Sequence, residues 1–124
     1  MTEPLLGVVV GHGEVARALV GAAEEISGVR GALVAVSNSG CDREQLEGRI
    51  AEAVGERAGV VFVDMAAGSC LFAAMRRFKG RPSVRTVTGV NLAMLLDFVF
   101  HRDLSAEAAA ARAVEIGGKA VGVK

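Results

Sequence analysis

The chain has 124 residues, enough for one domain with a buried core, and we expect residues 1–124 to form a single domain. Its 14 basic and 14 acidic side chains cancel, and its aromatic residues are five phenylalanines, so composition argues against a nucleic-acid-binding surface. No apolar run approaches the roughly 18 residues of a membrane span. The N-terminus lacks the basic and apolar regions of a signal peptide, and we therefore expect a cytoplasmic protein.

Short apolar runs alternate with helical patterns along the chain. Because these runs are continuous rather than alternating, they predict four strands buried on both faces: Leu5–Val10, Ala32–Val36, Val60–Val63 and Val84–Val87. The tail Ala120–Val123 is expected to add one more short strand.

Helical spacing and capping residues predict five helices between and after these strands. They are a helix from Val15 that stops at Gly28, one capped by Asp42 with Gln45 in a capping box, one over Ser69–Phe78, one over Leu92–His101, and one capped by Ser105 that ends at Gly117-Gly118. Such alternation is typical of βαβ units. We expect a three-layer α/β fold with a flavodoxin-like, four-stranded parallel sheet in the order 2-1-3-4.

Polar residues follow the carboxyl ends of the predicted strands, where open α/β sheets bind ligands. These segments are Gly11-His12-Gly13, Ser37–Gly40, Asp64–Ser69 and Thr88–Asn91. In the order 2-1-3-4 the first and third strands are neighbours. We therefore expect His12 and Asp64 to lie together, with Ser37 and Asn91 on the rim of the site.

A histidine beside an aspartate has a clear chemical use. A carboxylate that accepts the proton of one ring nitrogen leaves the other nitrogen as a nucleophile, and it stabilises the positive ring that forms on attack. Backbone amides that open the first and third helices, at Gly13, Gly68 and Ser69, are placed to hold an anion. The pattern predicts phosphoryl transfer through a phosphohistidine.

Three segments of the chain resemble the mannose-family IIA component of the bacterial phosphoenolpyruvate:sugar phosphotransferase system (PTS). They are VVVGHGEVARALVGAAEEISG, GVVFVDMAAGSCLFAAM and VTGVNLAMLLDF, which occur in the family's order and span most of the chain. The resemblance implies that His12 takes the phosphoryl group and Asp64 orients it, while Gly68 and Ser69 face the phosphate. It also implies a histidine phosphocarrier protein as donor, a IIB component as acceptor, and no cofactor.

The same resemblance implies a homodimer in which the C-terminal strand crosses to the partner subunit, and membrane association solely through a permease complex. Two positions depart from the family pattern. Gly11 replaces a hydroxyl residue, and the loop Ala67-Gly68-Ser69-Cys70 replaces Gly-Gly-Ser-Pro. These departures bear on loop stiffness and partner specificity more than on the chemistry.

Three alternatives remain at this stage. The pattern Gly11-x-Gly13-x-x-Ala16 fits a dinucleotide-binding fingerprint, but Ser37 and Asn38 stand at the end of the second strand, where an acidic residue would be needed to hold a ribose. A regulatory phosphoprotein without sugar transport would use the same histidine. No metal site is expected, because His12, Cys41 and Cys70 lack characteristic ligand spacing; stoichiometric zinc in the purified protein would overturn that view.

Overall fold

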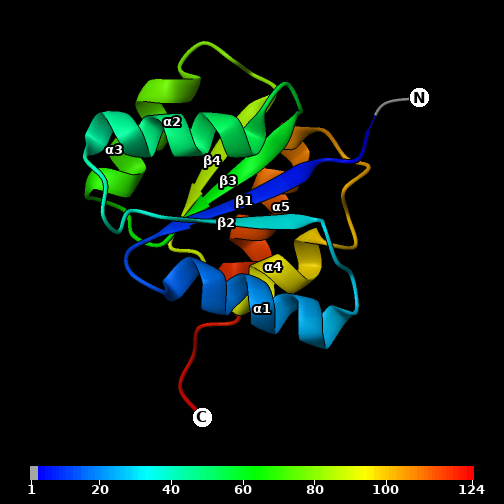
Figure 1. Cartoon of the computed structure of the whole chain (residues 1–124). Coiled ribbons are helices and arrows are strands. Elements are labelled where there is room, and N and C mark those ends of the chain that lie inside the picture. Colours follow the sequence, from blue (N-terminus) through cyan, green and yellow to red (C-terminus); the bar gives the residue numbers. More distant parts are fainter. Residues whose placement is uncertain (1–2) are drawn as a thin grey trace.

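A computed structural model describes residues 3–124 and contains one parallel sheet flanked by helices (Figure 1). In chain order the elements are β1 (Leu6–Gly11), α1 (Val15–Ser27), β2 (Leu33–Ser37), α2 (Arg43–Val54), β3 (Gly59–Val63), α3 (Ser69–Phe78), β4 (Val84–Thr88), α4 (Leu92–Phe98) and α5 (Ala106–Lys119). The strand order is β2-β1-β3-β4, with every neighbouring pair parallel. The predicted fold class and strand order are confirmed.

The two central strands explain the continuous apolar runs of the sequence. Every residue of β1 and of β3 is buried, because helices cover both faces of the sheet there. The edge strands β2 and β4 contain partly exposed positions. Their outer edges have no strand neighbour within the part of the chain that the structure describes.

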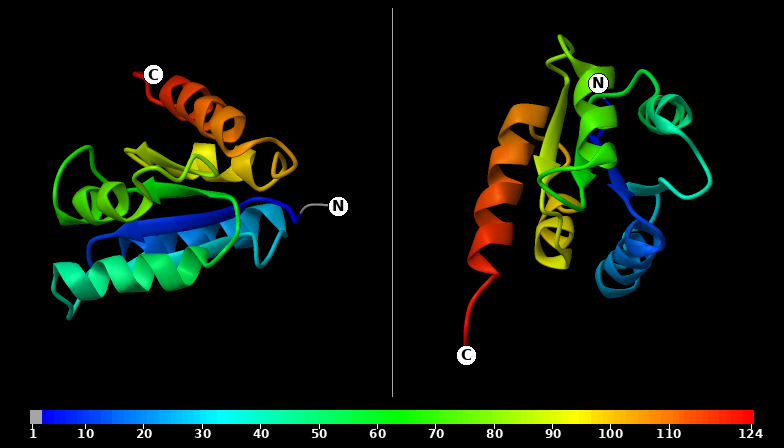
Figure 2. Two further views of the ribbon diagram at one scale, coloured as in Figure 1. Left: turned by 90° about the horizontal axis from the view of Figure 1, so that it is seen from above. Right: turned by 90° about the vertical axis from the view of Figure 1, so that its left-hand side faces the viewer.

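Helices cover the sheet in two layers, α2 and α3 on one face and α1, α4 and α5 on the other (Figures 1 and 2). Alternate residues of the central strands supply the two core layers. Val9 and Phe62 pack toward α1, α4 and α5, where the Phe62 and Phe98 rings meet edge to face at 5.2 Å between centroids. Val8 and Val61 pack toward α2 and α3. The sheet is thus anchored from both sides.

The sequence-based helix predictions agree with the structure, with two corrections. The Asp42–Gln45 capping box is present and α3 has the predicted bounds. Helix α4 ends at Phe98 rather than His101. Helix α5 continues through Gly117, which is a close-packing residue and not a stop, because an added β-carbon there would lie 2.4 Å from the Met94 side chain.

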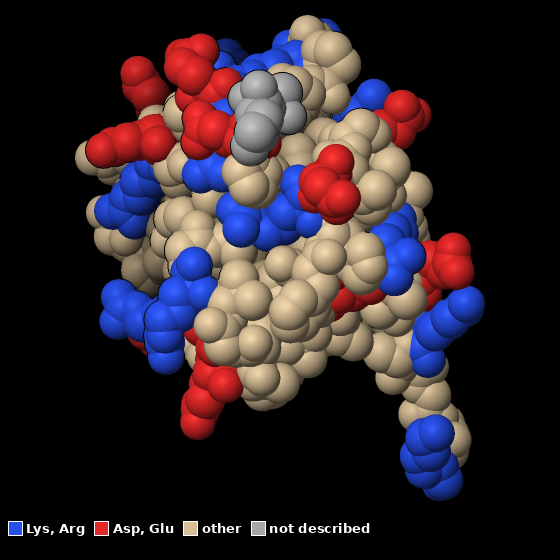
Figure 3. Space-filling view, turned by 90° about the vertical axis from the view of Figure 1, so that its right-hand side faces the viewer, with Lys and Arg blue, Asp and Glu red and all other residues tan. Residues whose placement is uncertain are grey.

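The C-terminal segment forms no strand in the described chain. Residues 120–124 are irregular, Val121 and Val123 are exposed, and the segment extends away from the molecule (Figure 1). Strand pairing by this segment remains a prediction. Within residues 3–124, no helix has the length and apolar character needed to cross a membrane. Acidic and basic side chains are interspersed on the face shown in Figure 3.

Candidate functional site at the ends of the central strands

The sheet brings His12 and Asp64 together as expected from the strand order. Val10 of β1 pairs in register with Val63 of β3, and the Asp64 amide donates to the Val10 carbonyl at 3.1 Å. His12 and Asp64 therefore leave adjacent central strands at the same height. The His12 Nδ1 atom lies 2.8 Å from Asp64 Oδ2.

One carboxylate oxygen orients the histidine through two contacts. Asp64 Oδ2 accepts from the His12 backbone amide at 2.9 Å as well as from Nδ1. The Asp64 side chain is 12% exposed and the His12 side chain 40% exposed. Because an ionised carboxylate only accepts hydrogen bonds, Nδ1 carries the ring proton and Nε2 holds the lone pair.

The free Nε2 atom faces the start of α3. A β-carbon on Gly68 would lie 3.9 Å from Nε2, and Gly68 has a φ of 98°, which favours glycine. No side chain caps this helix at Gly68. The first amides of α3, beginning at Ser69, therefore have no acceptor within the helix and form a site suited to an anion.

Gly13 has a different role from the predicted one. Its amide donates to Asn38 Oδ1 at 3.2 Å, and its carbonyl accepts from Ser37 Oγ at 2.8 Å. The amide that we expected to face phosphate therefore already has a protein acceptor. Ser37 does lie beside the histidine loop, as predicted, and Arg49 holds the Ser37 and Ser39 carbonyls at 2.8 and 2.9 Å.

Asn38 was missed by the analysis of the sequence. It follows β2, and its carboxamide fixes the residue next to His12. In the sequence, its position in the polar segment Ser37–Gly40 after the second strand pointed to the site. Asparagine is also common in turns, however, so the position alone did not single it out.

Asn91 lies after β4 but serves the packing of two helices. Its Oδ1 accepts from the Met94 amide at 3.1 Å, which caps α4. Its Nδ2 donates to the Gly117 carbonyl at 2.9 Å, which ties α4 to α5. Both polar atoms of the Asn91 side chain are thus engaged within the fold, and its place on the rim of the site stays a prediction.

Cys70 is an unexpected neighbour of the His–Asp pair. Its buried Sγ atom lies 3.8 Å from His12 Nδ1, on the first turn of α3. Burial, and then the negative charge of Asp64, raise the pKa of the Cys70 thiol from its ordinary value of 9.0 to about 11. The thiol is therefore protonated at neutral pH.

This pKa predicts a specific alkaline transition. In a Cys41→Ser background, the ultraviolet absorbance of the Cys70 thiolate should reach half its maximum near pH 11 in the folded chain and near pH 9 after unfolding. Between pH 9 and pH 11 the unfolded chain has lost the Cys70 proton while the folded chain still holds it. The Cys70 thiol therefore lowers the free energy of unfolding as the pH rises through this range. Half-titration at pH 9 or below in the folded chain would contradict the burial effect.

Gly11 marks a close approach between β1 and the aspartate. A β-carbon there would lie 3.4 Å from Asp64 Oδ2, in ordinary van der Waals contact. A small hydroxyl residue at this position would therefore reach the carboxylate. With glycine, the buried Asp64 Oδ1 atom has no hydrogen-bond partner among the described residues.

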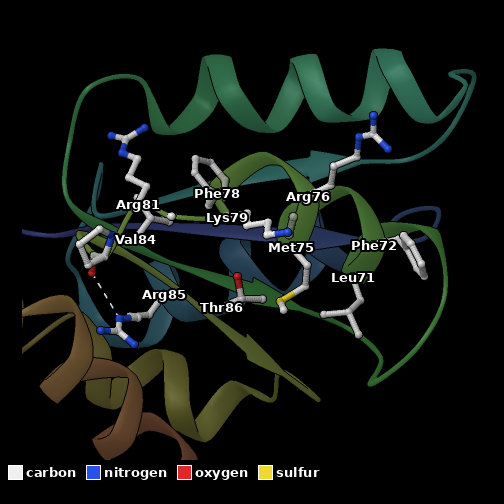
Figure 4. A pocket seen from close by; sticks show the side chains of 13 residues that line it. Leu71, Phe72, Met75, Arg76, Phe78, Lys79, Arg81, Val84, Arg85 and Thr86 are labelled. Atoms are coloured by element: carbon white, nitrogen blue, oxygen red, sulfur yellow. Dashed lines mark hydrogen bonds between the residues drawn. The ribbon is translucent and has the colours of Figure 1, made fainter.

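Two grooves on the described part of the chain lie away from this pair. One, of about 930 Å³, lies between α3 and β4 and is lined by Leu71, Phe72 and Met75 together with basic side chains (Figure 4). The other, of about 920 Å³, lies near the N-terminal residues and the start of α5. His12 and Asp64 line neither groove, and the His12 side chain is 40% exposed.

Residues 7–115 match the family model described as PTS system fructose IIA component. The chain belongs to this family. His12 and Asp64 both fall within the matched region, as do Gly68 and Ser69. The resemblance found in the sequence is thereby confirmed, and the chain is a PTS IIA component. No curated protein matches this IIA component.

Solved structures show the same fold. A mannose/sorbose specific IIA subunit from Enterococcus faecalis is 22% identical, with 98% of this chain and 96% of that chain covered and a TM-score of 0.85. A phosphotransferase system EIIA from Streptococcus agalactiae is 15% identical, with 96% of each chain covered and a TM-score of 0.88. A PTS IIA protein associated with the fucose utilization operon of Streptococcus pneumoniae is 19% identical, with 99% and 96% covered and a TM-score of 0.75.

Proposed function

We propose that this IIA component is a phosphohistidine carrier that accepts a phosphoryl group on His12 Nε2. The observation that carries the proposal is the pairing of Nδ1 with Asp64 Oδ2 at 2.8 Å, which leaves Nε2 free beside the uncapped start of α3. The donor is a histidine phosphocarrier protein and the acceptor is a IIB component. The protein is a phosphotransferase component that needs no cofactor and works in the cytoplasm.

The transfer is a substitution at phosphorus. The Nε2 lone pair forms the new N–P bond while the donor's N–P bond breaks, and its electron pair returns to the donor ring. The His12 ring becomes positive and keeps its proton on Nδ1, where Asp64 stabilises it. The amides of Ser69 and the following residue face the phosphoryl oxygens. The reverse sequence delivers the group to the IIB component.

Two other functions compete with this one. A regulatory phosphoprotein of the same family would use the same His12 chemistry, and it differs solely in lacking a IIB acceptor. A nucleotide-binding role is less well supported, because the Gly13 amide is occupied by Asn38 and β2 ends in Ser37 rather than an acidic residue.

The deciding test is the intact mass after incubation with phosphoenolpyruvate, enzyme I and the histidine phosphocarrier protein. We expect an acid-labile gain of one phosphoryl group in the wild type and in His101→Ala, and none in His12→Ala. His101 is a matched control because it is 37% exposed and also lies beside an aspartate, Asp97. Phosphorylation of His12→Ala, or none in the wild type while a known acceptor is charged, would contradict the proposal.

Transport and regulation separate at the next step. Once charged, the wild type is mixed with candidate IIB components, and the label is followed. Loss of the label from His12 to a IIB protein supports a role in sugar transport through a permease complex. Retention of the label with every IIB component of the same cell would favour the regulatory alternative.

We further propose a homodimer in which the C-terminal segment of one subunit extends the sheet of the other. The outer edge of β4 is unpaired in the described chain, and the groove between β4 and α3 offers apolar side chains. The exposed Val121 and Val123 alternate with other residues as a half-buried strand would. Unpaired strand edges are templates for such pairing.

Removal of residues 120–124 is therefore expected to weaken the dimer. The segment makes no strand contact within its own chain, so the monomer fold should persist. Light scattering across a dilution series is the measurement, with circular dichroism as the check on folding. A truncated chain that remains dimeric at the same dilution as the wild type would contradict this role.

A further inference from the structure

Three side chains of different ligand type converge behind the histidine ring. One atom each from His12, Asp64 and Cys70 lies within 4.8 Å of the other two. The Nδ1 atom is the centre of the group, 2.8 Å from Asp64 Oδ2 and 3.8 Å from Cys70 Sγ. Phosphoryl transfer through Nε2 uses His12 and Asp64, but the Cys70 thiol has no role in it.

We propose that His12 Nδ1, the Asp64 carboxylate and Cys70 Sγ form a Zn²⁺ site, and that Zn²⁺ bound there blocks phosphorylation of His12. Imidazole, carboxylate and thiolate are all ligands of Zn²⁺, at distances of about 2.0–2.3 Å. The thiolate excludes Mg²⁺ and Ca²⁺, which prefer oxygen ligands. The block rests on the proposed function, whereas the site itself does not.

The backbone makes the three ligands a preorganised set. Asp64 and His12 follow the two central strands, and Cys70 is buried in the first turn of α3. The His12 amide holds the carboxylate from outside the group, as supporting hydrogen bonds hold ligands in metal sites. The contact of 2.8 Å between Nδ1 and Oδ2 must open slightly to admit a metal ion. His12 is the most exposed of the three ligands, at 40%, so a metal ion would reach the site from the side of His12.

Proton balance explains why the metal ion blocks the reaction. Zn²⁺ displaces the proton of the Cys70 thiol, which is released to solvent, because a thiol that coordinates zinc is deprotonated. Zn²⁺ also takes the Nδ1 lone pair, so the single proton of the neutral ring moves to Nε2. The lone pair needed to attack phosphorus is then absent. Zinc binding and the acceptor role of Nε2 are therefore mutually exclusive.

The binding test uses ZnCl₂ and, as a spectroscopic probe, CoCl₂, with the wild type, Cys70→Ala and Cys41→Ser. Cys41 is the matched control, because it lies outside the three-residue group and its thiol contacts the Asn38 carbonyl. We expect one Zn²⁺ per chain and a thiolate-to-cobalt charge-transfer band in the wild type and in Cys41→Ser. Cys70→Ala should lose the band and bind Zn²⁺ at least about tenfold more weakly. Equal zinc affinity in Cys70→Ala, or a cobalt spectrum without the band in the wild type, would overturn the site.

The inhibition test adds phosphorylated donor to each variant after loading with Zn²⁺ and removal of the excess. We expect phosphorylation of the wild type and of Cys41→Ser to fall at least about tenfold and to return with a chelator, while Cys70→Ala is unaffected. Full phosphorylation of the zinc-loaded wild type would overturn the block but leave the site. If the metal-free wild type accepts no phosphoryl group, the proposed function fails, and the metal titration still decides the site by itself. Melting curves of the three proteins check that each variant is folded.

Discussion

Asp64→Asn is expected to slow phosphoryl transfer to His12 by about 10²- to 10³-fold. The carboxylate lies 2.8 Å from Nδ1, and its negative charge stabilises the positive ring that forms as Nε2 attacks. A neutral amide of the same shape leaves the ring in place but removes that charge. The larger effect is therefore expected on the rate of the transfer step, with the protein still folded.

The amide also has a geometric cost. To accept from the His12 backbone and ring nitrogens, its oxygen must take the place of Oδ2. Its NH₂ group then occupies the place of Oδ1, which is buried without a partner. A buried donor without an acceptor costs about 1–3 kcal/mol, so a modest loss of stability should accompany the kinetic effect.

The measurement is the rate of label transfer from the phosphorylated donor, with thermal melting to check the fold. Asp97→Asn is the control, because Asp97 of α4 also lies beside a histidine, His101. Its carboxylate instead pairs with Arg112 of α5 at 3.0 Å, away from His12. Its transfer rate should match the wild type. An Asp64→Asn protein that transfers at the wild-type rate would remove Asp64 from the mechanism.

Gly59→Ala is expected to destabilise the fold by about 2–3 kcal/mol. Gly59 opens β3 and pairs with Leu6 of β1, and an added β-carbon would lie 2.4 Å from the Leu6 carbonyl oxygen. Backbone of the neighbouring strand cannot move aside without disturbing the pairing of β1 with β3. Because those strands carry His12 and Asp64, the shift would also disturb the site.

Gly48→Ala provides the matched control for chemical denaturation. Gly48 is exposed in the middle of α2, and a β-carbon there meets nothing within 4 Å. Alanine is the better helix former, so this variant should be more stable than the wild type by about 0.5–1 kcal/mol. Equal stability of Gly59→Ala and the wild type would show that β1 and β3 can separate at this point without cost.

Much of the fold was predictable because the central strands are buried on both faces. Uninterrupted apolar runs such as Leu5–Val10 mark such strands, and Asp42 and Ser105 mark helix starts through their side-chain caps. The extent of α5 was not predictable, because glycine at position 117 signals a helix end in a sequence. Glycine is needed at position 117 because the Met94 side chain lies so close, and this contact can be seen only in the tertiary structure.

The site was predictable for the residues that strand order places at one edge. His12 and Asp64 follow neighbouring strands, so an order of 2-1-3-4 is enough to predict their contact. The places of Asn38 and Cys70 depend on side-chain direction within a loop and within the first turn of α3. Spacing in the sequence carries no information of that kind.

Because His12 and Asp64 follow the central strands β1 and β3, the geometry of the site should persist for as long as these two strands stay folded. Amide protons in the middle of these strands, such as those of Val9 and Val61, reach solvent when the domain opens as a cooperative unit, whereas edge strands fray separately. We therefore expect the contact between His12 and Asp64 to be lost when the whole domain opens, and not by separate local unfolding. Hydrogen exchange at β1 and β3 measures how often the carrier loses its reactive geometry, and the frayed edges can fluctuate without interrupting it.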